Sequence, residues 1–239
     1  MERRRGFLVG SWLGVILLGA GCTRALEVSY NADVQRLTQA DALAGIPVGV
    51  AKFEDKRAWV DQSDPKTLSY VGQAGPWRLG MDYKGKEYVP VRDVVQDVLV
   101  ESFNKAGLSA KAIEQILAKK DGPAFRQVGE QGGFRYVLGG EILVFEWANE
   151  KGVFTVTSRR AVTLQLLMVR VSDENPVLDT VVNDSERQDE GLGVLHSTNQ
   201  DRLMNTVFKQ VVQKVIMEVA AKLALHPRDV HITVASAPR

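Results

Sequence analysis

The chain has 239 residues, of which 45% are hydrophobic and 25% are charged, which is the composition of an ordinary globular domain. Residues 1–21 hold three of the 30 basic and one of the 29 acidic residues, so the remaining chain carries 27 and 28 and has a net charge of −1. A nearly neutral chain has no overall field that attracts nucleic acid, and we expect no nucleic-acid partner.

The first 22 residues have the pattern of a secretory signal. Three arginines, Arg3 to Arg5, precede an apolar block over residues 6–18, and small residues then lead to Cys22. The block is too short and too rich in glycine for a comfortable membrane span, but it has the length of a signal-peptide core. The pattern predicts a signal peptide over residues 1–21.

Gly19-Ala20-Gly21-Cys22 resembles the lipobox of bacterial lipoproteins, although leucine is the commonest residue at the position of Gly19. The resemblance implies a diacylglyceryl group on the Cys22 sulfur and a fatty acid such as palmitate on its freed amine. Cys22 is the only cysteine, so it has no partner for an internal disulfide. Thr23, where an aspartate would retain the protein at the inner membrane, implies an outer-membrane lipoprotein facing the periplasm. An ordinary secretory signal cut nearby and an uncleaved N-terminal anchor are the alternatives.

The mature chain predicts a single α+β domain over residues 46–226, preceded by a tether at 22–45 and followed by a loose tail at 227–239. One short strand is expected inside the tether, at 26–30. A buried strand is expected at 46–53, followed by an irregular stretch over 58–90. That stretch is expected to contain a hairpin around Lys84-Gly85-Lys86, with arms at Trp77–Tyr83 and Glu87–Val89.

The periodicity of the remaining chain predicts helices and a meander. Apolar residues recur at three and four positions over Val91–Ala106, between Pro90 and Gly107, which predicts a helix. Weaker helices are expected at 110–119 and 124–131, and a long amphipathic helix at 201–225. Three strands at 135–147, 160–171 and 177–184 predict an antiparallel meander, with a bulge or close backbone approach at Gly139-Gly140. The expected fold is a mixed, mostly antiparallel sheet covered by helices.

Three segments resemble YajG-type outer-membrane lipoproteins. They are the strand and charged turn over residues 48–57, the helix over 94–107 and the strand over 136–142. The N-terminal domain of TolB, the curli secretion lipoprotein and lipoprotein activators of peptidoglycan synthases have a similar layout. The resemblance implies partner binding at the cell envelope, and it transfers no functional residue.

No catalytic or metal-binding motif stands out, and we expect no enzyme activity, no metal and no cofactor. His196, His226 and His231 lack metal-ligand spacing. Glu141 and Glu146 are five apart on one expected strand, which places them on opposite faces unless a bend lies between them. The charged run at 54–57 is either a binding edge or, as we favour, a solvated turn whose charges pair locally.

The aromatic residues of the irregular stretch form the candidate partner-binding surface, because Trp and Tyr are frequent at interface hot spots. These residues are Trp59, Tyr70, Trp77, Tyr83 and Tyr88. They could equally cover the sheet edge as a small secondary core. The favoured function is a membrane-anchored envelope lipoprotein that binds another envelope protein or a glycan. An accessory subunit of an envelope transporter or secretion channel, and an unrecognised cell-wall hydrolase, are the alternatives.

Overall fold

The computed structural model describes residues 24–28, 34, 36–38, 40–74, 77–119, 122–151, 155–191 and 197–225. The described residues exclude the predicted signal peptide, Cys22, the predicted tail at 227–239 and all three histidines. Within the described chain, no helix is long and apolar enough to span a bilayer.

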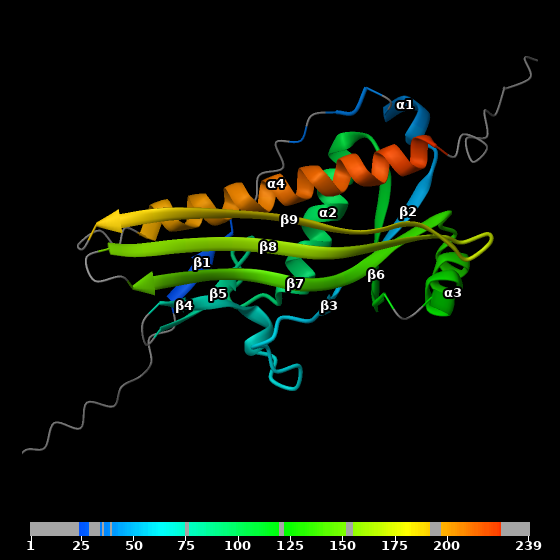
Figure 1. Cartoon of the computed structure of the whole chain (residues 1–239). Helices are drawn as coiled ribbons and strands as arrows, with labels where there is room; N and C mark the ends of the chain where they lie inside the picture. Colours follow the sequence, from blue (N-terminus) through cyan, green and yellow to red (C-terminus); the bar gives the residue numbers. More distant parts are fainter. Residues whose placement is uncertain are drawn as a thin grey trace, which may run out of the picture.

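Nine strands in the described residues form one mixed sheet (Figure 1). Its order is β1 (Arg24–Glu27), β5 (Trp77–Asp82), β4 (Tyr70–Ala74), β7 (Tyr136–Lys151), β2 (Pro47–Lys52) and β6 (Ser109–Ile116), and the short β3 (Glu54–Asp55) also pairs with β7. β8 (Thr155–Arg170) and β9 (Asn175–Gly191) complete a long antiparallel meander with β7. Most paired residues lie in antiparallel ladders, as expected.

Helices cover both faces of this sheet. α2 (Val91–Ala106) and α4 (Ser197–Ala224) pack on one face, and their apolar stripes form the main core with alternate residues of the strands. α3 (Gly122–Gly132) packs on the other face over a smaller cluster around Phe125, Val137 and Leu167. Adjacent residues such as Val137 and Leu138 belong to different clusters because successive side chains of a strand point to opposite faces.

Most of the expected elements are confirmed. α2 has the predicted bounds, with Pro90 at its start and Gly107 in the left-handed conformation at its end. The meander, α3, β2 and the long C-terminal helix are also where the sequence predicts them. Gly139 and Gly140 do make close backbone approaches, because an added Cβ would lie 2.7 Å from the Leu117 oxygen and 2.0 Å from the Gln165 oxygen, respectively.

The helix expected at 110–119 is wrong, because this segment is the edge strand β6. Ala110, Ile113 and Leu117 are buried at intervals of three and four residues, which imitates a helical period. The cause is a register irregularity: Ala51 pairs with Ile113, but the next residue, Lys52, pairs with Ile116. Two extra residues on β6 break the alternation that identifies a strand.

The segment expected to be a tether contains regular structure. β1 pairs in parallel with β5, Val28 is buried, and a one-turn helix, α1 (Ala40–Leu43), follows. The hairpin of the irregular stretch is formed by β4 and β5, and β4 was not expected. Tyr83 and Lys86 close a tight turn around Gly85, but the expected arm at Glu87–Val89 is not a strand.

Candidate functional site

The charged run after β2 is not a solvated turn. Asp55 and Arg57 are buried, with side chains 0% and 1% exposed, and the guanidinium binds both carboxylate oxygens at 2.8 and 2.6 Å. Only Glu54 and Lys56 form the half-exposed pair that we expected. The alternation of side chains along this extended stretch explains the division, since Asp55 and Arg57 point inward and their neighbours outward.

The Arg57 guanidinium occupies a gap in strand pairing along β7. β3 pairs with β7 up to Ile142, and β4 pairs with it only from Trp147. Between these points the guanidinium donates hydrogen bonds to the carbonyl oxygens of Tyr70, Leu68 (3.1 Å) and Phe145 (3.4 Å). Arg57 therefore takes the place of missing backbone donors and fixes the loop between β3 and β4 to the sheet.

The four predicted aromatic residues whose side chains the structure describes do not form one exposed surface. Trp59 is 43% exposed and lies over Arg57, with 4.8 Å between the guanidinium carbon and the ring centroid. Tyr70 and Tyr83 are buried, and the Tyr83 hydroxyl donates to Asp97 at 2.8 Å. Tyr88 is half-buried with its ring against Gly80, and the side chain of Trp77 lies outside the described part. Trp59 is thus the member that clearly reaches solvent.

Glu141 and Glu146 lie on the same face, against expectation. The register of β7 with β8 shifts between Ile142 and Val144, so one extra residue lies between the two glutamates. Glu141 pairs with Gln165 and Glu146 with Ala161, and these two partners share a face. They are four residues apart along β8, or about 13 Å, which is too far for a carboxylate pair to share one proton transfer.

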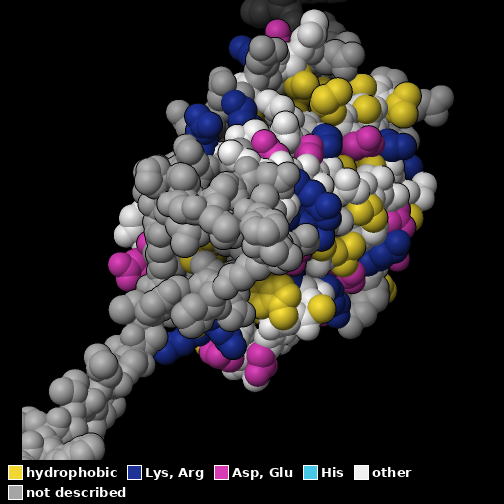
Figure 2. All heavy atoms as spheres, turned by 60° about the vertical axis from the view of Figure 1, so that its left-hand side comes forward, with side chains coloured by type: hydrophobic (Ala, Val, Ile, Leu, Met, Phe, Trp, Pro, Cys, Tyr) yellow, Lys and Arg dark blue, Asp and Glu magenta, His cyan; other side chains and the backbone are white. Residues whose placement is uncertain are grey.

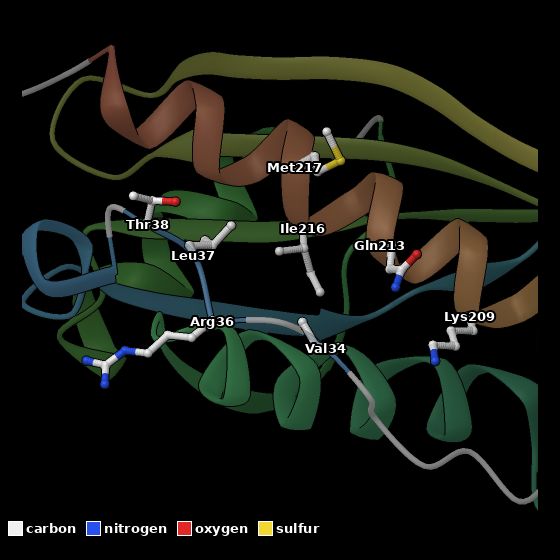
Figure 3. A pocket seen from close by; sticks show the side chains of 8 residues that line it. All are labelled: Val34, Arg36, Leu37, Thr38, Lys209, Gln213, Ile216 and Met217. Atoms are coloured by element: carbon white, nitrogen blue, oxygen red, sulfur yellow. The ribbon is translucent and has the colours of Figure 1, made fainter.

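A cavity of about 480 Å³ lies between α4 and the segment that precedes α1 (Figure 3). Ile216 on α4 and Val34 opposite it point toward one another, whereas the Arg36 side chain points away and pairs with Asp41 at 2.6 Å. Its lining consists of Val34, Arg36, Leu37, Thr38, Lys209, Gln213, Ile216 and Met217. The α4 members are spaced four, seven and eight residues from Lys209, so they share one face of the helix.

The lining of this cavity suits binding of an apolar group with a polar rim. None of its eight residues is Asp, Glu, His or Cys, and its floor is aliphatic. The Met217 side chain is 68% exposed, although α4 buries most of its other large apolar side chains in the core. Sequence reasoning missed this site because Val34 and Leu37 belong to the expected tether. Elsewhere in the described residues, no group of three or more His, Cys, Asp and Glu could hold a metal ion.

No protein-family model matches the chain, and no curated protein matches it. Among solved structures, protein XCC0632 from Xanthomonas campestris, described as a member of family DUF330, superposes with a TM-score of 0.51 at 11% identity. The match covers 85% of this chain and 99% of that one.

Two further likenesses are more distant. A putative neuraminyllactose-binding hemagglutinin homolog from Helicobacter pylori has a TM-score of 0.44 and 13% identity, covering 82% of this chain and 95% of that one. Lipoprotein GNA1162 from Neisseria meningitidis has a TM-score of 0.30 and 12% identity, covering 74% and 99%. These two carry no argument. The chain shares the fold of XCC0632, and its resemblance to YajG-type lipoproteins stays a prediction.

Proposed function

We propose that this protein is a cell-envelope lipoprotein, anchored through acylated Cys22, whose α+β domain binds a partner without catalysing a reaction. The observation that carries the proposal is the N-terminal sequence, in which a signal-like block ends in small residues and the only cysteine. Two or three acyl chains on that cysteine would give stable attachment, since each buried methylene contributes about 0.8 kcal/mol.

The partner-binding part of the proposal is supported by the cavity beside α4. Its aliphatic floor and its amide and amine rim suit an amphipathic segment of another envelope protein better than a reacting group. Such a segment would bury Ile216 and Met217, and the latter is largely exposed. A glycan partner would instead need stacking aromatic and polar groups, of which the exposed Trp59 is the best placed.

Metabolic labelling with a fatty-acid probe tests the anchor. We expect label on the wild type and none on Cys22→Ser, which should leave the membrane fraction. Label that survives in Cys22→Ser would contradict the anchor.

Two matched substitutions at Thr23 test the outer-membrane location. Thr23→Asp should move the protein to the inner membrane, as the lipoprotein resemblance implies, and Thr23→Ser should leave it at the outer membrane. If both variants fractionate like the wild type at the inner membrane, the outer-membrane location is wrong.

Photo-crosslinking in intact cells tests partner binding. A crosslinker at Gln213 lies beside the cavity, whereas one at Glu130 lies on α3, on the opposite face of the sheet. Both positions are exposed. We expect a discrete adduct at Gln213 and none at Glu130. Equal adducts at Gln213 and Glu130, or no adduct at Gln213, would contradict binding at this cavity.

A further inference from the structure

The folded domain begins almost at the proposed anchor. β1 starts at Arg24, only two residues after Cys22, and its four residues pair with Leu79 to Asp82 of β5. Two residues of extended chain span at most about 7 Å. If Cys22 is acylated, this length leaves no room for a flexible tether, and the start of β1 must lie at the lipid surface.

The sheet presents a row of arginines at this same end. In the register of the sheet, Arg78 of β5 pairs with Gln73, Gln73 with Ala148, Ala148 with Arg159, and Arg159 with Arg187. Residues in register share a face, and the row crosses five strands, or about 19 Å. Arg78 is adjacent in sequence to Leu79, the partner of Arg24, so the row lies beside the start of β1.

These arginines are available to solvent. Arg78 and Arg187 are exposed, and the Arg159 side chain is 37% exposed. Arg159 also contacts Glu146 at 3.4 Å, and Arg78 lies over the Tyr70 ring. Figure 2 brings this end of the molecule forward and shows basic side chains interspersed with acidic and hydrophobic ones.

The mixture of charges decides which lipid group would be recognised. Glu146 lies beside the row and contacts Arg159. The described side chains around the row therefore carry both signs of charge, which does not favour anionic lipids in particular. Arginine binds phosphate through paired N–H groups, and every phospholipid carries a phosphate.

The opposite end of the sheet lies far from the anchor. β9 runs from Asn175 to Gly191, and Arg187 lies twelve positions after Asn175, a rise of about 40 Å along the strand. The turn before Asn175 carries the acidic Asp173 and Glu174, and α3 packs near it through the ion pair of Arg126 with Glu174. The long meander thus separates the end that lies beside β1 from the end that carries the β8–β9 turn and α3 (Figure 1).

We infer that the end of the sheet with Arg78, Arg159 and Arg187 lies against the phosphate layer of a phospholipid surface. This inference rests on the proposed acylation of Cys22. The meander then stands away from the bilayer and holds the β8–β9 turn and α3 about 40 Å from it. The short anchor thus gives the elongated domain a fixed orientation relative to the bilayer, which a flexible tether would not.

Two serines at different distances from the anchor test the inferred orientation. Ser185 lies in the row next to the arginines, in register with Ala161, and Ser172 lies in the distal turn; both are exposed. The acylated Cys22 has no free thiol, so Ser185→Cys and Ser172→Cys each offer one thiol for a fluorescent label. The lipidated full-length mature protein is placed in phosphatidylcholine vesicles that carry a headgroup nitroxide quencher.

We expect quenching of the Ser185 label to exceed that of the Ser172 label about fivefold, because short-range quenching fades over a separation of tens of ångströms. Equal quenching, or stronger quenching at Ser172, would overturn the inferred orientation. Mass spectrometry of the same samples keeps the two proposals apart, because a preparation without acyl chains contradicts the proposed function before any quenching is read.

The contribution of the arginines has a matched control. The triple variant Arg78→Gln, Arg159→Gln, Arg187→Gln removes three proximal charges, and Lys119→Gln, Arg126→Gln, Arg170→Gln removes three charges outside the arginine row. We expect the proximal variant to reduce the quenching ratio about twofold or more and the control variant to leave it unchanged. An unchanged ratio in the proximal variant would overturn the assignment of this row to phosphate. Equal loss in both would mean that overall charge, not this row, orients the domain.

Discussion

Asp55 and Arg57 form a bidentate ion pair that is fully buried where the pairing of β3 with β7 stops. The sequence analysis placed these two residues in a solvated turn, but they are buried beside β7, where strand pairing is interrupted. The Arg57 guanidinium donates to the carbonyl oxygens of Leu68, Tyr70 and Phe145, which belong to the loop after β3, to β4 and to β7. The aromatic face of Trp59 covers the guanidinium from outside, so the loop, the strand gap and the exposed tryptophan form one unit.

Replacing Asp55 should therefore be costly. Asp55→Asn leaves the buried guanidinium of Arg57 without a counter-charge, and breaking a buried pair in this way destabilises a protein by about 3–5 kcal/mol. Glu54→Gln is the matched control, since it breaks the half-exposed pair with Lys56 and should cost about 0–1 kcal/mol. Urea unfolding followed by circular dichroism measures both. Similar costs for the two variants would show that burial does not govern the Asp55–Arg57 pair.

Gly140 is a second position where one atom should decide stability. Its φ is +146°, and an added Cβ would lie 2.0 Å from the carbonyl oxygen of Gln165 on β8. Gly140→Ala should destabilise the domain by about 3 kcal/mol or more. Alanine disfavours this φ, and its Cβ would force β7 and β8 apart. Gly122→Ala at the start of α3 meets nothing within 4 Å and should be neutral or stabilise by up to about 1 kcal/mol. A thermal melt of the two variants separates the effects.

Local periodicity was sufficient for elements whose pattern is uninterrupted. The helix at Val91–Ala106 repeats its apolar residues without a break, and both its ends carry residues suited to helix termini. The meander was predictable for the same reason, since β-branched and aromatic residues dominate each strand. These elements include most of the main core.

Local sequence patterns could not predict β-bulges or contacts between segments that are far apart in the sequence. The extra residues on β6 and the extra residue between Glu141 and Glu146 change which face later side chains occupy, and each depends on a partner strand far away in sequence. The burial of Arg57 depends on a gap between β3 and β4 that no local pattern reveals. The cavity combines α4 with a polar segment more than 170 residues earlier, so its members share no sequence signal.

Gln96 shows how a polar residue can be essential on an apolar helix face. It lies on the buried side of α2, and its Nε2 donates hydrogen bonds to the carbonyl oxygens of Val50 at 2.8 Å and Ile113 at 2.7 Å. Ile113 is the last regularly paired residue before the register irregularity of β6. Gln96 thus joins β2 and β6 where their own ladder is interrupted.

Gln96→Met keeps the volume of this side chain but removes both donors. We expect a loss of about 1–3 kcal/mol, because two buried carbonyl oxygens lose a partner. Gln127→Met, on the exposed surface of α3, should change stability by no more than about 0.5 kcal/mol. The free energy of unfolding in urea gives the comparison, and a neutral Gln96→Met would mean that the interrupted ladder does not need this bridge.

The contacts between the tight turn around Gly85 and α2 should make stability depend on acidic pH. Asp97 accepts hydrogen bonds from Lys84 (2.7 Å) and the Tyr83 hydroxyl (2.8 Å). Partial burial acts to raise the pKa of Asp97, but these hydrogen bonds outweigh it and hold the pKa below its ordinary value. The folded state therefore binds this proton more weakly than the unfolded state. The contribution of Asp97 to stability is present above its unfolded pKa of about 3.9 and is lost as pH falls through the lower folded value.

Asp97→Asn should remove this part of the acid sensitivity. The fall in melting temperature between pH 5 and pH 3 should be smaller in the variant than in the wild type, although the variant is less stable at pH 7. Glu87→Gln removes an exposed carboxylate from the same loop and should retain the wild-type slope. If Asp97→Asn loses stability in parallel with the wild type as the pH falls, the hydrogen bonds from Lys84 and Tyr83 do not lower the pKa of Asp97. The loss of stability at low pH would then come from other carboxylates, such as Glu101, which also binds Lys84. The pKa of Glu101 is lowered mainly by its hydrogen bond with Lys105.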